Sequence, residues 1–112
     1  MSDRITKINE LIHSIVGELL ERAVSWKHGI FVTVVRVETA HNLRSTKVFV
    51  SVFPETETRY AMETLRHEQK SLEQKLRMRL ATKPLPKLFF AIDTSNQGLD
   101  EIEKILKQIH SE

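Results

Sequence analysis

Cysteine is absent from this 112-residue sequence, and glycine and proline occur only three times each. Without cysteine the chain cannot form a disulfide framework, a thiolate zinc site or a thiol nucleophile. The three glycines, at positions 17, 29 and 98, are too far apart for a phosphate-binding loop or a dinucleotide-binding turn. The sequence therefore argues against enzymes with a cysteine nucleophile, a thiolate zinc site or a glycine-rich nucleotide-binding loop.

Long apolar runs are also absent. No segment approaches the roughly 18 consecutive apolar residues that a membrane span needs, and the N-terminus is too charged for a secretion signal. A hydrophobic content of 40% with 29% charged residues is typical of a globular protein, and the length suits one hydrophobic core. We predict a single domain over residues 1–112, located in the cytoplasm, with no membrane partner.

Catalytic and metal-binding patterns are scarce. The five histidines show no i, i+4 pair, and most carboxylates stand beside lysine or arginine, as Glu101 and Glu103 do beside Lys104. No nucleophile, paired acid and base, or metal cluster can be assembled from neighbouring residues. We therefore expect no enzyme activity, no metal, no cofactor and no small-molecule substrate, and rank an enzyme acting on RNA last among the possible functions.

Hydrophobic spacing predicts the secondary structure. Apolar residues at intervals of three and four predict helices over 4–22 and 58–81, and runs rich in β-branched residues predict strands over 30–37, 46–53 and 88–92. A last helix is predicted from the apolar stripe Leu99, Ile102, Ile105, Leu106 and Ile109. Gln69 stands where the stripe of the 58–81 helix needs an apolar residue, so we predict a kink there.

The order α-β-β-α-(kink)-α-β-α predicts an α+β domain in which helices cover one face of a three-stranded sheet. The first two strands are expected to pair antiparallel. Along the second strand three valines alternate with Phe49, Ser51 and Phe53, which gives the strand two different faces. We assign the strand phenylalanines to the core, and Trp26 to a lid over the core in preference to a base-stacking role.

The charge of the chain is concentrated in one segment. Residues 66–87 contain seven basic and two acidic residues, a local charge of +5 in a chain whose net charge is +2. Residues 1–65 are neutral, with eight charges of each sign, and residues 88–112 carry two basic and five acidic residues. Because a phosphate backbone responds to local surface charge, RNA or another polyanion is the favoured partner, with a solvated helix face as the alternative.

Helical geometry separates these cations into two groups. At 100° per residue, one stripe beside the apolar face contains Arg66, Lys70 and Arg77, with Glu73 among them. Lys75 and Arg79 fall on the opposite flank. A second candidate surface is the connection 41–47 between the first two strands, where a polar turn is the alternative interpretation. The candidate RNA-binding residues are Arg44, Lys47, Arg66, Lys70, Lys75, Arg77, Arg79, Lys83 and Lys87.

Two local patterns carry a resemblance to a known family. Residues 42–51, NLRSTKVFVS, are similar to D-L-x-x-A-K-V-Y-V-S, and residues 86–95, PKLFFAIDTS, are similar to P-x-L-x-F-x-x-D-x-S. With the element order, they resemble the ribosome-binding factor A family over nearly the full length. The family's interrupted helix carries Ala-x-Gly, where this chain has Glu68, Gln69 and Lys70.

The resemblance implies a type II KH-like fold and a non-catalytic factor that binds the free small (30S) ribosomal subunit and its 16S rRNA. It also implies a role in late rRNA processing and subunit maturation, often associated with growth in the cold. We expect a monomer. The alternative is a protein-interaction or homodimerising module that uses the first helix or the exposed sheet face.

Overall fold

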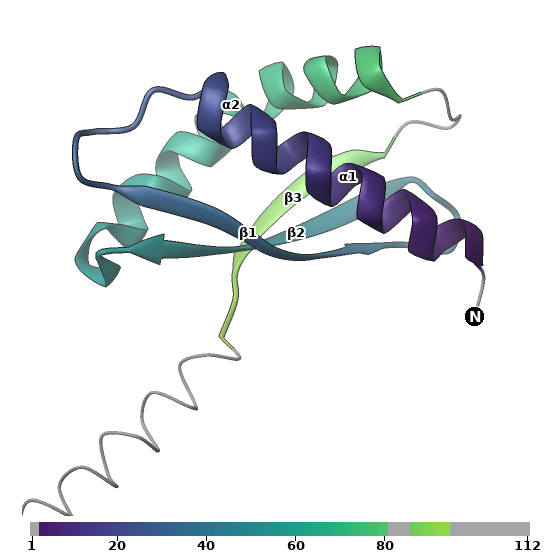
Figure 1. The fold of residues 1–112 in the computed structure, drawn as a ribbon, viewed down its shortest axis with the longest axis horizontal. Coiled ribbons are helices and arrows are strands. Elements are labelled where there is room, and N and C mark those ends of the chain that lie inside the picture. Colours follow the sequence, from purple (N-terminus) through teal and green to yellow (C-terminus); the bar gives the residue numbers. More distant parts are fainter. Residues whose placement is uncertain (1–2, 81–85, 95–112) are drawn as a thin grey trace, which may run out of the picture.

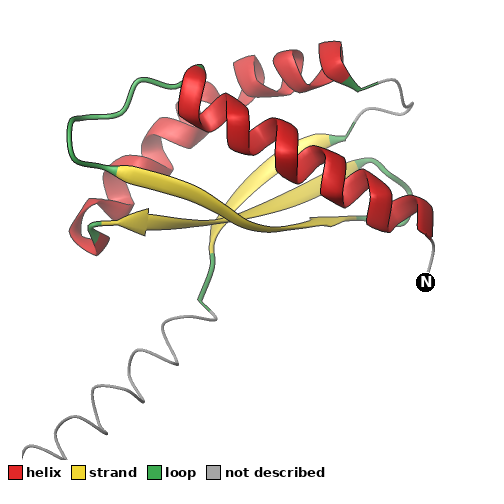
Figure 2. Cartoon of the chain, in the orientation of Figure 1, coloured by secondary structure: helices red, strands yellow, loops and turns green. Residues whose placement is uncertain are grey.

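The computed structural model describes residues 3–80 and 86–94, and it contains two long helices and one sheet (Figure 1). The helices and strands, coloured by type in Figure 2, are α1 (Asp3–Arg22), β1 (Phe31–Thr39), β2 (Ser45–Phe53), the short 3₁₀ helix η1 (Glu55–Glu57), α2 (Thr58–Arg79) and β3 (Lys87–Ile92). Each predicted helix and strand in this part of the chain is confirmed, with boundaries shifted by at most two residues. The predicted last helix lies outside the described residues.

The three strands form one sheet in the order β1-β2-β3. β1 and β2 pair antiparallel, as predicted, with Val32 opposite Val52 and a bulge between Val34 and Arg36. β3 returns parallel to β2 and places Leu88 beside Thr46. The central strand is therefore β2, and both β1 and β3 are edge strands.

Both helices lie on the same face of the sheet (Figures 1 and 2). α1 packs mainly over β1 and α2 over β3, because each carries one apolar stripe that must be buried. The most deeply buried side chains of the core are Ile12, Val16, Leu20, Val48, Val50, Leu65, Leu72, Leu76 and Leu88. This packing confirms the predicted α+β architecture, with one covered and one open face of the sheet.

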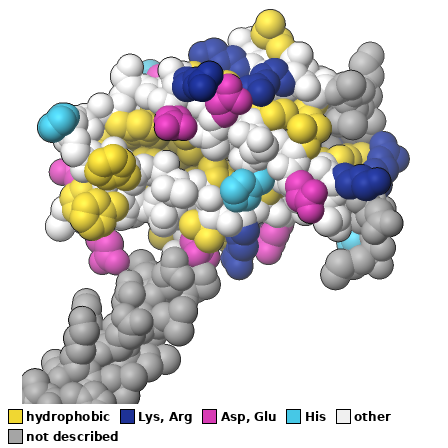
Figure 3. Space-filling view, in the orientation of Figure 1, with side chains coloured by type: hydrophobic (Ala, Val, Ile, Leu, Met, Phe, Trp, Pro, Cys, Tyr) yellow, Lys and Arg dark blue, Asp and Glu magenta, His cyan; other side chains and the backbone are white. Residues whose placement is uncertain are grey.

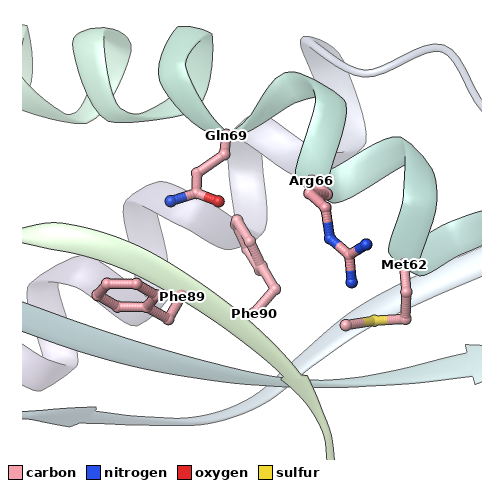
Figure 4. A pocket seen from close by; sticks show the side chains of 5 residues that line it. All are labelled: Met62, Arg66, Gln69, Phe89 and Phe90. Atoms are coloured by element: carbon pink, nitrogen blue, oxygen red, sulfur yellow. The ribbon is translucent and has the colours of Figure 1, made fainter.

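α2 is one continuous helix of 22 residues rather than two helices separated by a break. Its ribbon nevertheless changes direction near Gln69 (Figures 1 and 4). The predicted kink is therefore a bend within an unbroken helix. Gln69 is half-buried at this bend, between the deeply buried Leu65 and Leu72.

The assignment of the strand phenylalanines to the core was wrong for three of them. Phe31, Phe53 and Phe89 are 65%, 67% and 48% exposed. Strand alternation points Phe31 and Phe53 away from the helices, and Phe89 lies on the edge strand β3, where it borders a hollow beside α2. The valines of β2 fill the covered face instead. Trp26, in contrast, is half-buried against the core and donates its indole N–H to the carbonyl of Leu20 at 2.9 Å, which confirms its role as a lid.

Candidate nucleic-acid interface

Exposed cations line the side of α2 that faces β3. Arg66, Lys70 and Arg77 are all exposed, and none has an ion-pair partner among the described residues. Glu73 lies on the same stripe, and its carboxylate accepts the backbone N–H of Leu88 in β3 at 2.7 Å. This bond fixes the stripe next to the free edge of the sheet, and it also engages the one acidic side chain that interrupts the three cations.

A small hollow of about 150 Å³ lies between α2 and β3. Figure 4 shows Arg66 and Gln69 extending from the bend of α2 toward the strand, with Phe90 rising from β3 between them. Met62 and Phe89 complete the lining. The hollow thus combines an exposed guanidinium, an amide and aromatic carbon, groups that can hold a phosphate and a base side by side. Met62, Gln69 and the two phenylalanines were not predicted as site residues.

At the start of β3 the sequence-distant residues Arg44 and Lys87 come together. The backbone N–H of Lys87 donates to the carbonyl of Arg44 at 3.0 Å, and both side chains are exposed. The turn that presents Arg44 is held by Asn42, whose side-chain oxygen accepts the Arg44 N–H at 2.9 Å. Leu43 is buried with φ at 60°, a left-handed conformation that leucine rarely adopts. Tertiary packing therefore fixes this turn.

Other predicted site residues lie on different surfaces. Arg79 forms an ion pair with Glu18 of α1 at 3.0 Å, and Glu18 also pairs with Arg22 at 3.3 Å. Figure 3 shows Lys and Arg side chains with carboxylates among them over the ends of α1 and α2. Lys75 is exposed on the flank of α2 opposite the basic stripe. Lys83 lies outside the described residues.

Lys47 points to the open face of the sheet, away from α2. Its ammonium nitrogen lies 5.8 Å from the ring centre of Phe49, and the guanidinium of Arg36 lies 3.9 Å over the same ring. Arg36 was not predicted as a site residue because its neighbours in β1 are apolar. The alternation of β2 could have identified this group of side chains on the open face, because it places Lys47, Phe49 and Phe53 on one side of the strand.

Within residues 3–80 and 86–94, no group of three or more histidine, aspartate or glutamate side chains is placed to hold a metal ion. No helix in the same residues is long and apolar enough to cross a membrane. The arrangement of the described side chains is suited to binding a polyanion through cations and aromatic rings.

Comparison with known proteins shows the family of this chain. A family model described as ribosome-binding factor A matches residues 4–106. The chain belongs to the ribosome-binding factor A family. Ribosome-binding factor A of Natranaerobius thermophilus is 33% identical over 110 residues, which cover 96% of this chain and 82% of that protein.

Solved structures of ribosome-binding factor A share the fold. The crystal structure of the Thermus thermophilus protein superposes with a TM-score of 0.70 at 19% identity, covering 79% of this chain and 94% of that one. A homology model of the Thermus thermophilus protein, fitted into a cryo-EM map of a complex between the 30S subunit and ribosome-binding factor A, gives a TM-score of 0.65 at 23% identity. It covers 77% of this chain and 91% of that chain. The KH-like fold that the family resemblance implied is confirmed.

Proposed function

We propose that this protein binds the free small ribosomal subunit through 16S rRNA and assists late rRNA processing and subunit maturation. Membership of the ribosome-binding factor A family supports the class of partner. A Thermus thermophilus relative with the same fold has been fitted into a map of its complex with the 30S subunit. We infer that the protein acts as a monomer in the cytoplasm and without catalysis.

The observation that carries the proposal is the basic stripe of α2. Arg66, Lys70 and Arg77 are exposed along β3, and no described carboxylate forms an ion pair with them. Cations without ion-pair partners can replace the counterions that surround RNA phosphates, which makes binding favourable and dependent on salt. Because phosphate contacts position a protein without selecting sequence, the partner is recognised by its shape.

Different groups extend the interface at the start of β3 and farther along the strand. Lys87 and Arg44 add two cations where β3 begins. The hollow beside Arg66 adds aromatic carbon next to charge. A structured rRNA segment lying along the gap between α2 and β3 would meet cations at both of its ends.

The test is a sedimentation experiment with a tagged form of the protein. The protein is expected to co-sediment with immature small subunits and not with mature ones, and its binding to purified small-subunit rRNA should weaken as salt rises. Replacement of Lys70 or Arg77 by alanine should reduce the slope of log affinity against log salt by about 1 for each phosphate that the variant no longer neutralises.

Lys7→Ala is the matched control, because Lys7 is an exposed lysine on α1, away from the basic stripe. It should leave the slope unchanged. Equal effects of Lys7→Ala and Lys70→Ala would show that net charge, and not this stripe, governs binding. Co-sedimentation with mature subunits alone would refute the maturation role.

Processing is tested separately in cells that lack the protein. We expect unprocessed ends of 16S rRNA to accumulate, and more strongly during growth in the cold. Normal processing together with normal binding would separate a ribosome-binding role from a maturation role.

A further inference from the structure

The open face of the sheet carries exposed aromatic rings that the fold does not require. Phe31 and Phe53 are 65% and 67% exposed, and their ring centres lie 6.5 Å apart on paired positions of β1 and β2. Figure 3 shows hydrophobic side chains at the surface at this end of the sheet, where β1 begins and β2 ends. Phe89 of β3, 48% exposed, lies opposite Lys47 at the other end of the sheet and also borders the hollow beside α2. These rings contribute little to the core.

Cations accompany the rings on this face. The guanidinium of Arg36 lies 3.9 Å over the ring of Phe49, and the ammonium of Lys47 lies 5.8 Å from the same ring. Lys87 is exposed at the start of β3. Glu38 is the acidic side chain beside them, and its carboxylate is 3.9 Å from Arg36. The face therefore has a positive end and an aromatic end.

We propose that this open sheet face binds single-stranded RNA, with bases stacking on Phe31 and Phe53 and with the cations at the other end contacting the phosphates. The inference deepens the proposed function, on which it rests, by adding a second RNA surface opposite the helices. Exposed bases are present in single strands and are stacked on their neighbours inside a duplex, so the ligand is an unpaired segment.

The spacing of the rings and the cations fits an extended RNA strand. Lys47 and Phe53 are six residues apart on β2, which corresponds to about 20 Å along an extended strand. A base can stack at the aromatic end while phosphates farther along the same RNA strand contact the cations. The second ring at the aromatic end, Phe31, widens the stacking surface across the two strands.

The charge on this face disfavours a second copy of the chain as the occupant. A two-fold contact that aligns the positive ends would bring Arg36, Lys47 and Lys87 of one copy toward the same cations of the other, and the opposite alignment would set these cations against uncharged rings. Among the described residues, the carboxylate that pairs with these cations is that of Glu38, which lies beside Arg36. The phosphates of RNA match this charge.

The experiment measures the affinity of wild-type protein and variants for three probes: an unstructured pyrimidine oligoribonucleotide, the same strand annealed into a duplex, and an abasic strand that keeps the phosphates. Phe53→Ala and Phe31→Ala should each weaken binding to the single strand by about 5- to 150-fold, the range for one aromatic stacking interaction. They should leave the salt slope unchanged, since no cation is removed. Binding of the duplex and of the abasic strand should not change.

Leu11→Ala is the matched control, because Leu11 is a 46% exposed apolar side chain on α1. It should bind all three probes as the wild type does. The Lys70→Ala variant lowers the salt slope if the α2 stripe binds RNA. If Lys70→Ala lowers the slope while the phenylalanine variants bind normally, the sheet-face inference fails and the proposed function stands. If wild-type protein binds none of the probes or the subunit, both fail.

A Phe53→Trp variant identifies what covers the face. In free protein the new indole should be accessible to acrylamide at all protein concentrations, and it should be shielded when the single strand is added. Shielding that grows with protein concentration would show a second copy on this face, and shielding at every concentration would show the chain's own residues there. Either result would overturn the inference.

Discussion

Replacing Glu73 by alanine removes the carboxylate that joins α2 to β3. In the folded protein this carboxylate accepts the backbone N–H of Leu88 at 2.7 Å. Leu88 is fully buried at 0% exposure, and β3 is an edge strand, so within the described part of the chain its outward N–H has no neighbouring strand to bind. We expect Glu73→Ala to leave that N–H without a partner and to loosen β3 from the helix.

The magnitude follows from the kind of bond. A hydrogen bond to a charged group contributes about 1.5–3 kcal/mol, and an unsatisfied buried backbone group costs about 1–3 kcal/mol. Alanine recovers a few tenths of a kcal/mol through its higher helix propensity. Glu73→Ala should therefore lower the free energy of unfolding by about 1–2.5 kcal/mol. Glu73→Gln keeps a neutral acceptor and should cost about 1 kcal/mol less than alanine.

Urea unfolding followed by circular dichroism measures both variants, with Gln74→Ala as control. Gln74 is the exposed neighbour of Glu73 on α2, so its replacement should leave the unfolding midpoint almost unchanged. Binding gives a second readout, because Glu73 is the acidic group within the basic stripe. Glu73→Gln should strengthen RNA binding at low salt, and the gain should shrink as salt rises.

Two results would refute this reasoning. If Glu73→Ala is as stable as the wild type, the hydrogen bond from the Leu88 N–H to the Glu73 carboxylate makes no net contribution to the stability of the protein. If glutamine and alanine cost the same, the destabilisation comes from charge or packing and not from a missing acceptor.

Three further predictions concern stability and the remaining cations. Gly17→Ala should stabilise the protein by about 0.5–1 kcal/mol, because Gly17 lies inside α1 and an added Cβ would meet no heavy atom within 4 Å; an unchanged urea midpoint would contradict this. Leu76→Ala should lower the free energy of unfolding by about 2–5 kcal/mol, since Leu76 is 1% exposed in the core. A melting temperature equal to that of the wild type would show instead that the core relaxes around the missing side chain. Arg79→Ala should lower the free energy of unfolding by less than about 1 kcal/mol, because the ion pair between Arg79 and Glu18 is solvent-exposed. In RNA-binding titrations Arg79→Ala should matter less than Arg66→Ala, and the opposite order would place RNA on the α1 side of α2.

Secondary structure and fold class could be predicted because local periodicity reflects burial directly. The stripe of α1 and the valines of β2 each repeat with the period of their element, so the covered side of the fold follows from the pattern. The element order then leaves few topologies. Which apolar set of β2 faces the helices was harder to predict, because both alternating sets contain large apolar residues. Assigning the phenylalanines to the core failed for this reason.

The candidate site was predictable only in part. Counting charge along the sequence found Arg66, Lys70 and Arg77, since one helix places them on one stripe whatever the rest of the chain does. It could not tell that Arg79 pairs with Glu18, which lies 61 residues away, or that Glu73 binds the backbone of β3. Such contacts depend on how two elements pack, and no local pattern encodes them.

By itself, the sequence determined which segments are helix and strand, that the elements form an α+β fold, and where positive charge is concentrated, because each of these depends on residues close together along the chain. Only the tertiary structure decided that β3 lies parallel to β2 beside the basic stripe, that Arg44 meets Lys87, and that aromatic rings remain on the open face. These features require segments that are distant in sequence to pack together, and the free energy of that packing belongs to the whole fold.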